Sequence, residues 1–202
     1  ESIKNQYINY MDLSEDEFYY IHPLWDIGTY FHRLFLAYPY INLWGLKGSG
    51  KSKIMDLSAL FTFNSLSLSD ASISSVFRTV DSNFSTLYID EAENLWAKAD
   101  MGDDDTSDLV AMFNAGWMNN RLIMRSNKND PDKIQHFNPY CAKMFASIKG
   151  LRGALQERAI TEITLKAKKE DPKGDLWPIE NETTIAIRNK LYRFALQNWG
   201  MV

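Results

Sequence analysis

The chain of 202 residues is short of cysteine and histidine, with a single cysteine, Cys141, and three histidines. One cysteine excludes an internal disulfide and a cysteine metal cluster, and this usage is typical of proteins in a reducing cytosol. The sequence also lacks an apolar run approaching the roughly 18 residues of a membrane-spanning helix, and no secretory signal segment is visible. We therefore expect a cytoplasmic protein that has no membrane partner.

A strong excess of either charge is also missing, because the net charge is only −4. This value does not by itself indicate a nucleic-acid partner, so the local distribution of charge matters more. With 45% hydrophobic residues, the chain is long enough to bury one ample core. Since it begins at Glu1 rather than at a methionine, we expect it to be a piece of a longer protein.

The most informative segment present runs from Gly45 to Ser52 and fits the phosphate-binding pattern G-x-x-x-x-G-K-[ST] at every fixed position. A short apolar strand is predicted before it and a helix after it. Glycines let backbone N–H groups approach phosphate oxygens, and the helix start adds the positive end of its dipole. The predicted nucleotide-binding residues are Gly45, Gly48, Ser49, Gly50, Lys51 and Ser52.

Within this segment two side chains have predicted roles toward ATP. Lys51 is expected to reach the β- and γ-phosphates, and the Ser52 hydroxyl is expected to join the ligands of a Mg²⁺ ion. A second pair of polar residues, Asp90 and Glu91, follows the apolar strand predicted at 86–89. The spacing from Lys51 leaves room for one helix–strand–helix passage, and open α/β sheets bind ligands at the carboxyl ends of their strands.

This position assigns Asp90 to Mg²⁺, directly or through water, and Glu91 to the activation of a water that attacks the γ-phosphate. An ordinary acidic helix start is the alternative for the pair. Ser147 follows another predicted strand, and it is equally well explained as a sensor of the γ-phosphate or as a turn serine. From composition alone, Arg158 is interpreted as the partner of a surface ion pair with Glu157 or Glu162.

Strands alternate with helices along the chain, which predicts a mostly parallel sheet covered on both faces. A lead-in helix is expected to open at Pro23 and to run through Phe35, and Thr106 or Ser107 is expected to start a helix that ends near Gly116. Thr183 or Thr184 is expected to start the last helix. The predicted strands are 40–44, 65–68, 86–89, 141–146 and 159–165, and further helices are predicted at 51–61 and 71–80.

A basic segment lies between residues 119 and 152, with seven basic and two acidic residues. Within it, the runs 121–125 and 133–137 predict two short strands that are joined by a turn at 126–132, hence a hairpin. A basic hairpin can follow the phosphates of single-stranded DNA, although a merely solvated hairpin fits equally well. The candidate DNA-binding residues are Arg121, Arg125, Lys128 and Lys133.

Several blocks occur in an order that resembles a known family. They are Ser75–Arg78, Thr86–Ala92, Phe113–Trp117, Arg125, Phe145–Ile148 and Leu155–Ile160. Over roughly residues 40–166 the chain is similar to the ATPase domain of phage- and plasmid-encoded primase–helicase proteins, a branch of the AAA+-like P-loop ATPases. The segment Leu151–Ala154 departs from the family, which often carries Leu-Pro and an acidic residue there. No primase motif is present.

The resemblance implies a three-layer P-loop NTPase fold of the AAA+/ASCE type, with a mostly parallel five-stranded sheet, helices on both faces and an inserted β-hairpin. It also implies a ring-shaped homo-oligomer, expected to be a hexamer, in which Arg158 acts in trans on a neighbour's nucleotide. Arg152 is the second candidate for that role, and Ser147 matches the nucleotide-sensing residue. The implied domains are a helical lead-in at 1–37, an ATPase core at 38–168, and a linker with a C-terminal helix, or partial lid, at 169–202.

The function expected from these features is an Mg²⁺-dependent ATPase motor, a DNA helicase or translocase encoded by a phage or plasmid and acting in the host cytoplasm. Any primase or other replication domain would lie outside this chain. A nucleotide-gated loader or switch that binds a replication partner is the main alternative. A superfamily-2-type helicase or terminase motor is a further alternative, which the position of Arg158 late in the chain disfavours. A small-molecule kinase is another, and the lack of an arginine-rich lid disfavours it.

Overall fold

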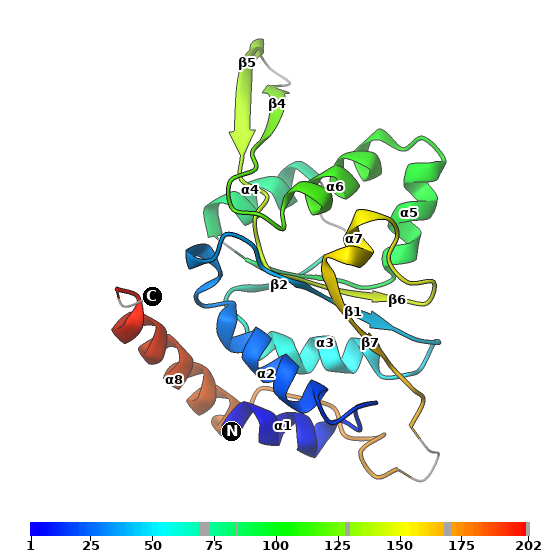
Figure 1. The fold of residues 1–202 in the computed structure, drawn as a ribbon, viewed down its shortest axis with the longest axis vertical. Helices are drawn as coiled ribbons and strands as arrows, with labels where there is room; N and C mark the ends of the chain where they lie inside the picture. The colour runs from blue at the N-terminus through cyan, green and yellow to red at the C-terminus, as the bar shows by residue number, and fades with distance from the viewer. Residues whose placement is uncertain (69–72, 84, 128–129, 168–170, 201–202) are drawn as a thin grey trace.

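The structure is a computed structural model that describes residues 1–68, 73–83, 85–127, 130–167 and 171–200. Its centre is a five-stranded sheet with the order β2-β3-β6-β1-β7, in which every neighbouring pair is parallel. The strands are β1 (Tyr40–Trp44), β2 (Ser65–Leu68), β3 (Thr86–Ile89), β6 (Lys143–Ser147) and β7 (Ala159–Ile163). Because all five run the same way, their carboxyl ends meet along one edge (Figure 1).

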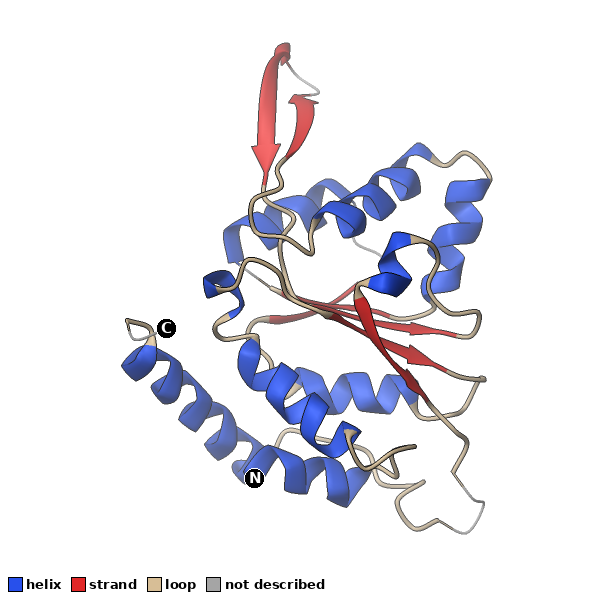
Figure 2. Cartoon of the chain, in the orientation of Figure 1, coloured by secondary structure: helices blue, strands red, loops and turns tan. Residues whose placement is uncertain are grey.

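Helices cover both faces of the sheet (Figure 2). This cover explains why the side chains of β1, β3 and β6 are buried on both sides of the sheet. In β1, Ile41 and Leu43 point into one core and Tyr40 into the other. Parallel strands that are buried on both faces carry continuous rather than alternating apolar residues. Helix, sheet and helix therefore form three layers, as predicted.

One helical layer consists of α1 (Ser2–Tyr10), α2 (Phe18–Gly28), α3 (Lys51–Ala59) and α8 (Glu182–Asn198). The other consists of α4 (Ile73–Asn83), α5 (Ala92–Asp100), α6 (Asp104–Ala115) and α7 (Ala154–Glu157). Figure 1 shows the two groups on opposite sides of the sheet. The lead-in segment packs on the same core, because its residues Ile3 and Tyr7 share one cluster with residues of α3 and α8.

The predicted bounds of several helices were wrong by a few residues. Pro23 lies inside α2, which begins at Phe18 and ends at Gly28, and only the short 3-10 helix His32–Leu34 follows. Helix α6 begins earlier than Thr106 because the Asp103 side chain accepts a hydrogen bond from the Thr106 N–H and caps it. Helix α1 and helix α5 were not predicted from the sequence.

The last helix and two strands also differ slightly from expectation. Helix α8 begins at Glu182 because Asn181 and Thr184 form a reciprocal capping box. Strand β6 begins at Lys143, two residues after the predicted start, and β7 ends at Ile163. The predicted start of α4, residues 71 and 72, lies outside the described residues.

The expected hairpin is present and consists of β4 (Ile123–Asn127) and β5 (Asp130–Phe137), which pair antiparallel. Both strands run further into the predicted turn than expected. At the base of the hairpin, Ile123 pairs with Phe137, and both side chains pack against the core that contains α6. From there the hairpin projects away from the body of the molecule (Figure 1).

Candidate functional site

The loop that joins β1 to α3 has the backbone that its glycines permit. Gly48 and Gly50 have φ values of 77° and 87°, in the left-handed region that side chains other than glycine rarely adopt. Gly45 is needed for a different reason, because a Cβ there would lie 2.2 Å from Thr164 Oγ1. All three glycines therefore have a local structural requirement, and two of them, Gly45 and Gly50, are fixed positions of the motif.

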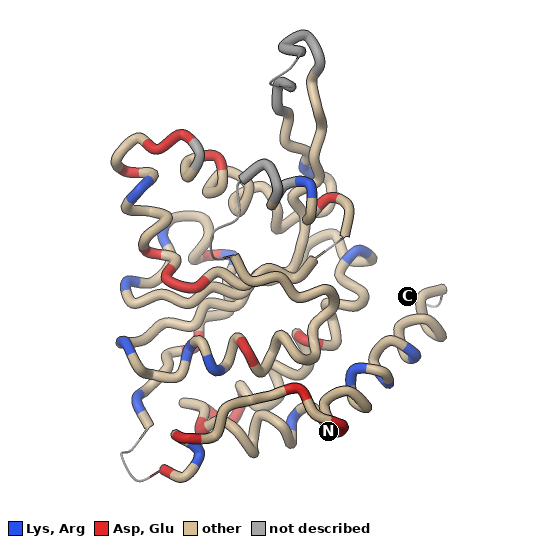
Figure 3. The backbone as a smooth tube through the Cα atoms, turned by 180° about the vertical axis from the view of Figure 1, so that it is seen from behind, with Lys and Arg blue, Asp and Glu red and all other residues tan. Residues whose placement is uncertain are grey.

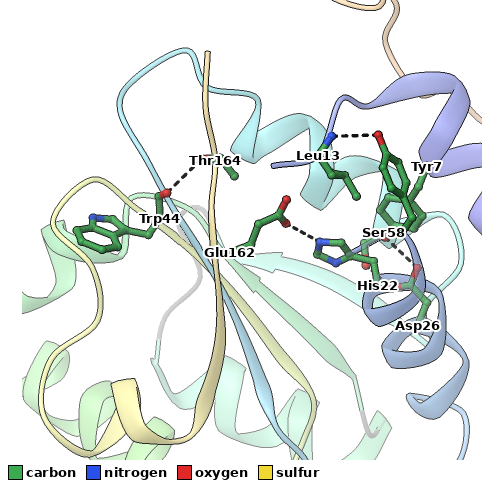
Figure 4. Close-up of polar contacts among 9 residues, drawn as sticks. Tyr7, Leu13, His22, Asp26, Trp44, Ser58, Glu162 and Thr164 are labelled. Carbon is green, nitrogen blue, oxygen red and sulfur yellow. Dashed lines mark hydrogen bonds and ion pairs between the residues drawn. The ribbon is translucent and has the colours of Figure 1, made fainter. Parts of the chain in front are cut away.

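Thr164, which follows β7 directly, supports this loop from the neighbouring strand. Its N–H donates to the Trp44 carbonyl at 2.8 Å, and its hydroxyl shares a hydrogen bond of 2.7 Å with Ser49 Oγ. Figure 4 shows Thr164 beside Trp44, with the His22–Glu162 contact of 2.7 Å on the same strand. The loop is thus held in place by β7 as well as by its own backbone.

Lys51 is buried at the start of α3, and its ammonium group bonds to the loop itself. The Nζ atom donates to the carbonyls of Gly45 at 2.7 Å and Leu46 at 3.0 Å. These bonds place the charge at the centre of the concave side of the loop. A cation at the N-terminus of a helix, surrounded by free N–H groups, creates a local excess of positive potential that suits an anion.

Ser52 and Asp90 are brought together from the two separate segments that the sequence analysis paired. Ser52 Oγ donates to Asp90 Oδ2 at 2.7 Å, which joins the start of α3 to the end of β3. The two strands β1 and β3 that precede these residues are not adjacent, because β6 lies between them. This contact therefore depends on the tertiary fold, and the sequence pattern anticipated both of its members.

Glu91 lies next to Asp90 and adopts a strained backbone, with φ 49°. For a residue with a side chain this left-handed conformation costs energy, of order 1 to 3 kcal/mol, and such outliers gather at functional sites. Its N–H donates to Asp90 Oδ1 at 2.8 Å, and its Oε2 accepts a bond of 2.8 Å from Asn94 Nδ2. The strain and both bonds fix the carboxylate of Glu91 at the mouth of the site.

These residues line one cleft of about 360 Å³ at the carboxyl edge of the sheet, where Figure 3 shows basic and acidic residues close together. Burial lowers the pKa of Lys53 in this cleft. Burial also raises the pKa of Asp56 on the same helix, and the nearby Asp90 adds to that rise. The lining residues are Lys47, Gly48, Ser49, Gly50, Lys51, Ser52, Lys53, Asp90, Glu91, Glu93, Ala146, Ser147, Ile148, Gly174 and Trp177.

The donor set of this cleft fits a magnesium ion that is shared with a phosphate ligand. No group of three or more His, Cys, Asp or Glu side chains that could hold a metal is found within the described ranges. Mg²⁺ at phosphate sites does not require such a group, because one or two protein oxygens suffice when waters and phosphate oxygens supply the rest. Ser52 Oγ and Asp90 Oδ2, already 2.7 Å apart, are such a pair.

Ser147 lies at the end of β6, between the strands that carry the loop and the acidic pair, and it is fully buried. Its hydroxyl donates to Asn42 Oδ1 in a long bond of 3.4 Å. The side chain lines the cleft, so the structure places the predicted sensor residue beside Ser52, Asp90 and Glu91.

The arginines at 152 and 158 lie elsewhere, in a second groove of about 680 Å³ between α5, α6 and α7. This groove also includes Arg121 and has no lining residue in common with the first cleft. Arg158 donates to the Asn114 carbonyl at 2.5 Å and lies over the Trp117 ring, 5.0 Å from its centroid. Arg152 pairs with Asp100 at 2.8 Å. We call this surface the arginine groove.

The ion pairs suggested for Arg158 from composition are not the contacts that it makes. Glu162 is buried and bonded to His22, so it faces away from Arg158. The Asn114 that binds Arg158 belongs to the Asn-Ala-Gly block, and Gly116 of that block is required because a Cβ there would lie 2.2 Å from the Pro139 carbonyl. The position of Arg158 away from its own loop is compatible with a role in trans, which stays a prediction.

The DNA-binding residues predicted in the hairpin are only partly described. Arg121 is exposed, just before β4, and lies 5.7 Å from the centroid of the Trp117 ring. Arg125 and Lys133 belong to β4 and β5, where the structure describes the backbone. Lys128 lies outside the described residues.

Sequence reasoning missed several residues of the site. Gly174 and Trp177 line the cleft but come from a segment that the sequence indicates only as a loop. Thr164 and Asn94 position the loop and Glu91, respectively. Glu93 accepts a bond of 3.2 Å from the Ile148 N–H. Only Glu93, two residues after Glu91, had a local signal in the sequence.

No known protein-family model and no curated protein sequence matches the chain. Among solved structures, it is similar to the A form apo structure of the C-terminal region of NrS-1, with a TM-score of 0.51 and 18% sequence identity. The match covers 96% of this chain and 43% of the NrS-1 chain, so this chain spans less than half of that region. The two proteins share a fold.

In the part of the chain that is described, no helix is both long and apolar enough to cross a membrane.

Proposed function

We propose that the chain is the ATP-hydrolysing motor domain of a DNA helicase or translocase that acts in phage or plasmid replication. The observation that carries the proposal is the bond from Ser52 Oγ to Asp90 Oδ2, with Glu91 adjacent. It unites a phosphate-binding sequence pattern and an acidic strand end in one cleft. The proposed role in replication rests on the resemblance of the sequence blocks to primase–helicase ATPase domains, and the chain shares its fold with the NrS-1 C-terminal region.

In the proposed reaction each residue has a distinct task. The N–H groups at the start of α3 and the Lys51 ammonium bind the β- and γ-phosphates of ATP. Ser52 and Asp90 hold Mg²⁺, which neutralises charge on the phosphate oxygens when it is bound. Glu91 orients the attacking water and accepts its proton at the carboxylate. Ser147, at the tip of β6, contacts the γ-phosphate and reports its presence.

Among the described residues that line the cleft there is no arginine to stabilise the charge that develops on the transferred phosphate. A neighbouring copy would supply one, Arg158, so we propose that the active form is a ring, expected to be a hexamer. The projecting hairpin is the proposed contact with single-stranded DNA. Its position outside the compact body suits an element that reaches a separate ligand.

The test is Mg²⁺-dependent ATP hydrolysis by purified protein, with and without single-stranded DNA. Wild-type protein should hydrolyse ATP faster when DNA is present. Glu91→Gln should bind ATP but hydrolyse it at least 100-fold more slowly, an order of magnitude typical of a lost general base. Glu17→Gln, an exposed glutamate at the start of α2, is the matched control and should behave as wild type.

Wild-type turnover by Glu91→Gln would remove this residue from the mechanism, and a lack of ATP binding by wild-type protein would refute the proposed function. A strand-displacement assay then distinguishes a motor from a loader. ATP hydrolysis without any strand separation by the full-length protein would favour the nucleotide-gated loader.

A further inference from the structure

The segment between β7 and α8 includes a tryptophan that the proposed mechanism leaves without a role. Trp177 lines the cleft together with the loop residues, yet 54% of its surface is exposed. Its one polar atom is already satisfied, because Nε1 donates to Asp56 Oδ2 at 3.1 Å. What remains exposed is the apolar indole ring system, in a cleft that also holds the charged side chains of Lys51 and Asp90.

The bond to Asp56 determines where this ring lies. Asp56 follows Ser52 by four residues on α3, and residues with this spacing lie on the same face of a helix, one turn apart. The rise of about 1.5 Å per residue separates them by about 6 Å along the axis. The indole is therefore held about one helical turn from the proposed site of Mg²⁺ and the phosphates.

Other bonds fix the segment that carries Trp177. Lys53 Nζ donates to the Lys173 carbonyl at 2.5 Å, and Lys173 Nζ donates to the Met11 carbonyl at 3.0 Å. The Leu176 N–H donates to the Lys173 carbonyl at 3.1 Å. Gly174 lines the cleft next to this turn and brings no side chain into it. Bonds to α3 and to the residue after α1 thus anchor the segment before any ligand arrives.

We propose that Trp177 stacks on the base of the bound nucleoside triphosphate. This inference rests on the proposed function and deepens it by naming the group that binds the non-phosphate end of the substrate. A preorganised aromatic ring binds a flat base at little entropic cost, and base–aromatic stacking strengthens binding whatever the base. Every base has a π-face, so stacking alone predicts similar affinity for ATP and GTP.

The test compares ATP with inorganic tripolyphosphate, which lacks the ribose and the base, by calorimetric titration in the presence of Mg²⁺. Trp177→Ala should weaken ATP binding about tenfold and leave tripolyphosphate binding within about twofold of wild type. Trp177→Phe keeps an aromatic ring and should restore most of the ATP affinity. Trp199→Ala removes a similarly exposed tryptophan, 45% accessible at the end of α8, and should leave both affinities unchanged.

The outcomes separate this inference from the proposed function. ATP binding by Trp177→Ala that equals wild type, together with its loss in Lys51→Ala, would refute stacking and leave the ATPase proposal standing. An equal loss of ATP and tripolyphosphate affinity in Trp177→Ala would also refute stacking, because the phosphates would then be affected. Wild-type protein that binds neither ligand would refute both proposals.

Discussion

The cleft at the carboxyl edge of the sheet and the arginine groove between α5, α6 and α7 differ in how complete they are. In the cleft, residues from four segments meet, and Ser52 and Asp90 are already bonded to each other. In the groove, Arg121, Arg152 and Arg158 lie together, and Arg152 pairs with Asp100 whereas Arg158 is held by a neutral asparagine. Under the proposed function, the groove acquires its role when it faces the nucleotide of a neighbouring copy.

The largest effect is expected for Arg158, because it tests whether the two surfaces cooperate between copies. Arg158→Ala should leave ATP affinity unchanged and reduce hydrolysis about 10³-fold, as for other trans-acting arginines. Mixing it with Lys51→Ala protein should restore part of the activity, since each variant supplies what the other lacks. Hydrolysis assays of the separate and mixed proteins measure this.

Arg152→Ala is the matched variant in the same groove, and it should reduce hydrolysis much less because Arg152 already pairs with Asp100. If Arg152→Ala abolishes hydrolysis and Arg158→Ala does not, Arg152 and not Arg158 is the arginine that acts in trans. If neither variant affects hydrolysis, the cleft acts without the groove, and the proposed cooperation between the two surfaces is wrong.

A smaller effect is expected inside the cleft for Ser52→Ala. Loss of the hydroxyl leaves Asp90 as the single protein ligand of the proposed ion, so hydrolysis should fall about 100-fold and the Mg²⁺ concentration for half-maximal rate should rise. A magnesium titration of the ATPase rate measures both changes. An unchanged magnesium requirement would place the ion elsewhere.

Beneath the cleft, Asp26 is buried among hydroxyl groups, with Tyr7 Oη and Ser58 Oγ donating to it at 2.9 and 2.6 Å (Figure 4). Burial raises its pKa to about 8, against the effect of both bonds. The folded protein therefore keeps a proton that the unfolded chain has lost above about pH 4. Stability should fall as the pH rises from about 4 to about 8.

Asp26→Asn should remove this dependence. We expect the wild-type free energy of unfolding to fall by about 4 kcal/mol between pH 5 and pH 8.5 relative to that of the variant. Urea denaturation at both pH values measures the difference. Parallel changes in the two proteins would show that Asp26 does not hold a proton. On the groove side, burial lowers the pKa of Lys143, which contributes in the opposite direction.

The smallest effect is expected in the hairpin. Arg125→Ala should weaken binding to single-stranded DNA a few-fold and reduce the magnitude of the salt-dependence slope by about 0.7, the value for one phosphate contact. The rate of ATP hydrolysis without DNA should stay at the wild-type level. Fluorescence anisotropy at several salt concentrations measures the slope, and an unchanged slope would assign the hairpin another role.

The sequence predicted the residues of the cleft that belong to contiguous patterns. The loop 45–52 and the pair Asp90–Glu91 each combine a strand, a turn and polar residues within a few positions, so local rules suffice. The strands 40–44, 65–68 and 86–89 were likewise predicted with their correct bounds. Close spacing makes these features visible in a single sequence.

The contacts that depend on distant segments could not be predicted. Trp177 reaches the cleft through its bond to Asp56, and no periodicity in residues 166–180 indicates this. Arg158 faces Asn114 only because α6 packs on α7. Even local rules competed at the start of α6, where Asp103 caps the helix and Thr106, itself a good cap, lies inside it.

Strand β7 has a further consequence for a ring of such chains. Arg158 immediately precedes it and Thr164 immediately follows it, so one straight segment of about 20 Å joins the arginine groove to the phosphate loop. The buried contact between Glu162 and His22 fixes this segment sideways at its centre. If one neighbouring chain displaced the arginine groove, this rigid segment would transmit the displacement to the phosphate loop, which faces the second neighbouring chain.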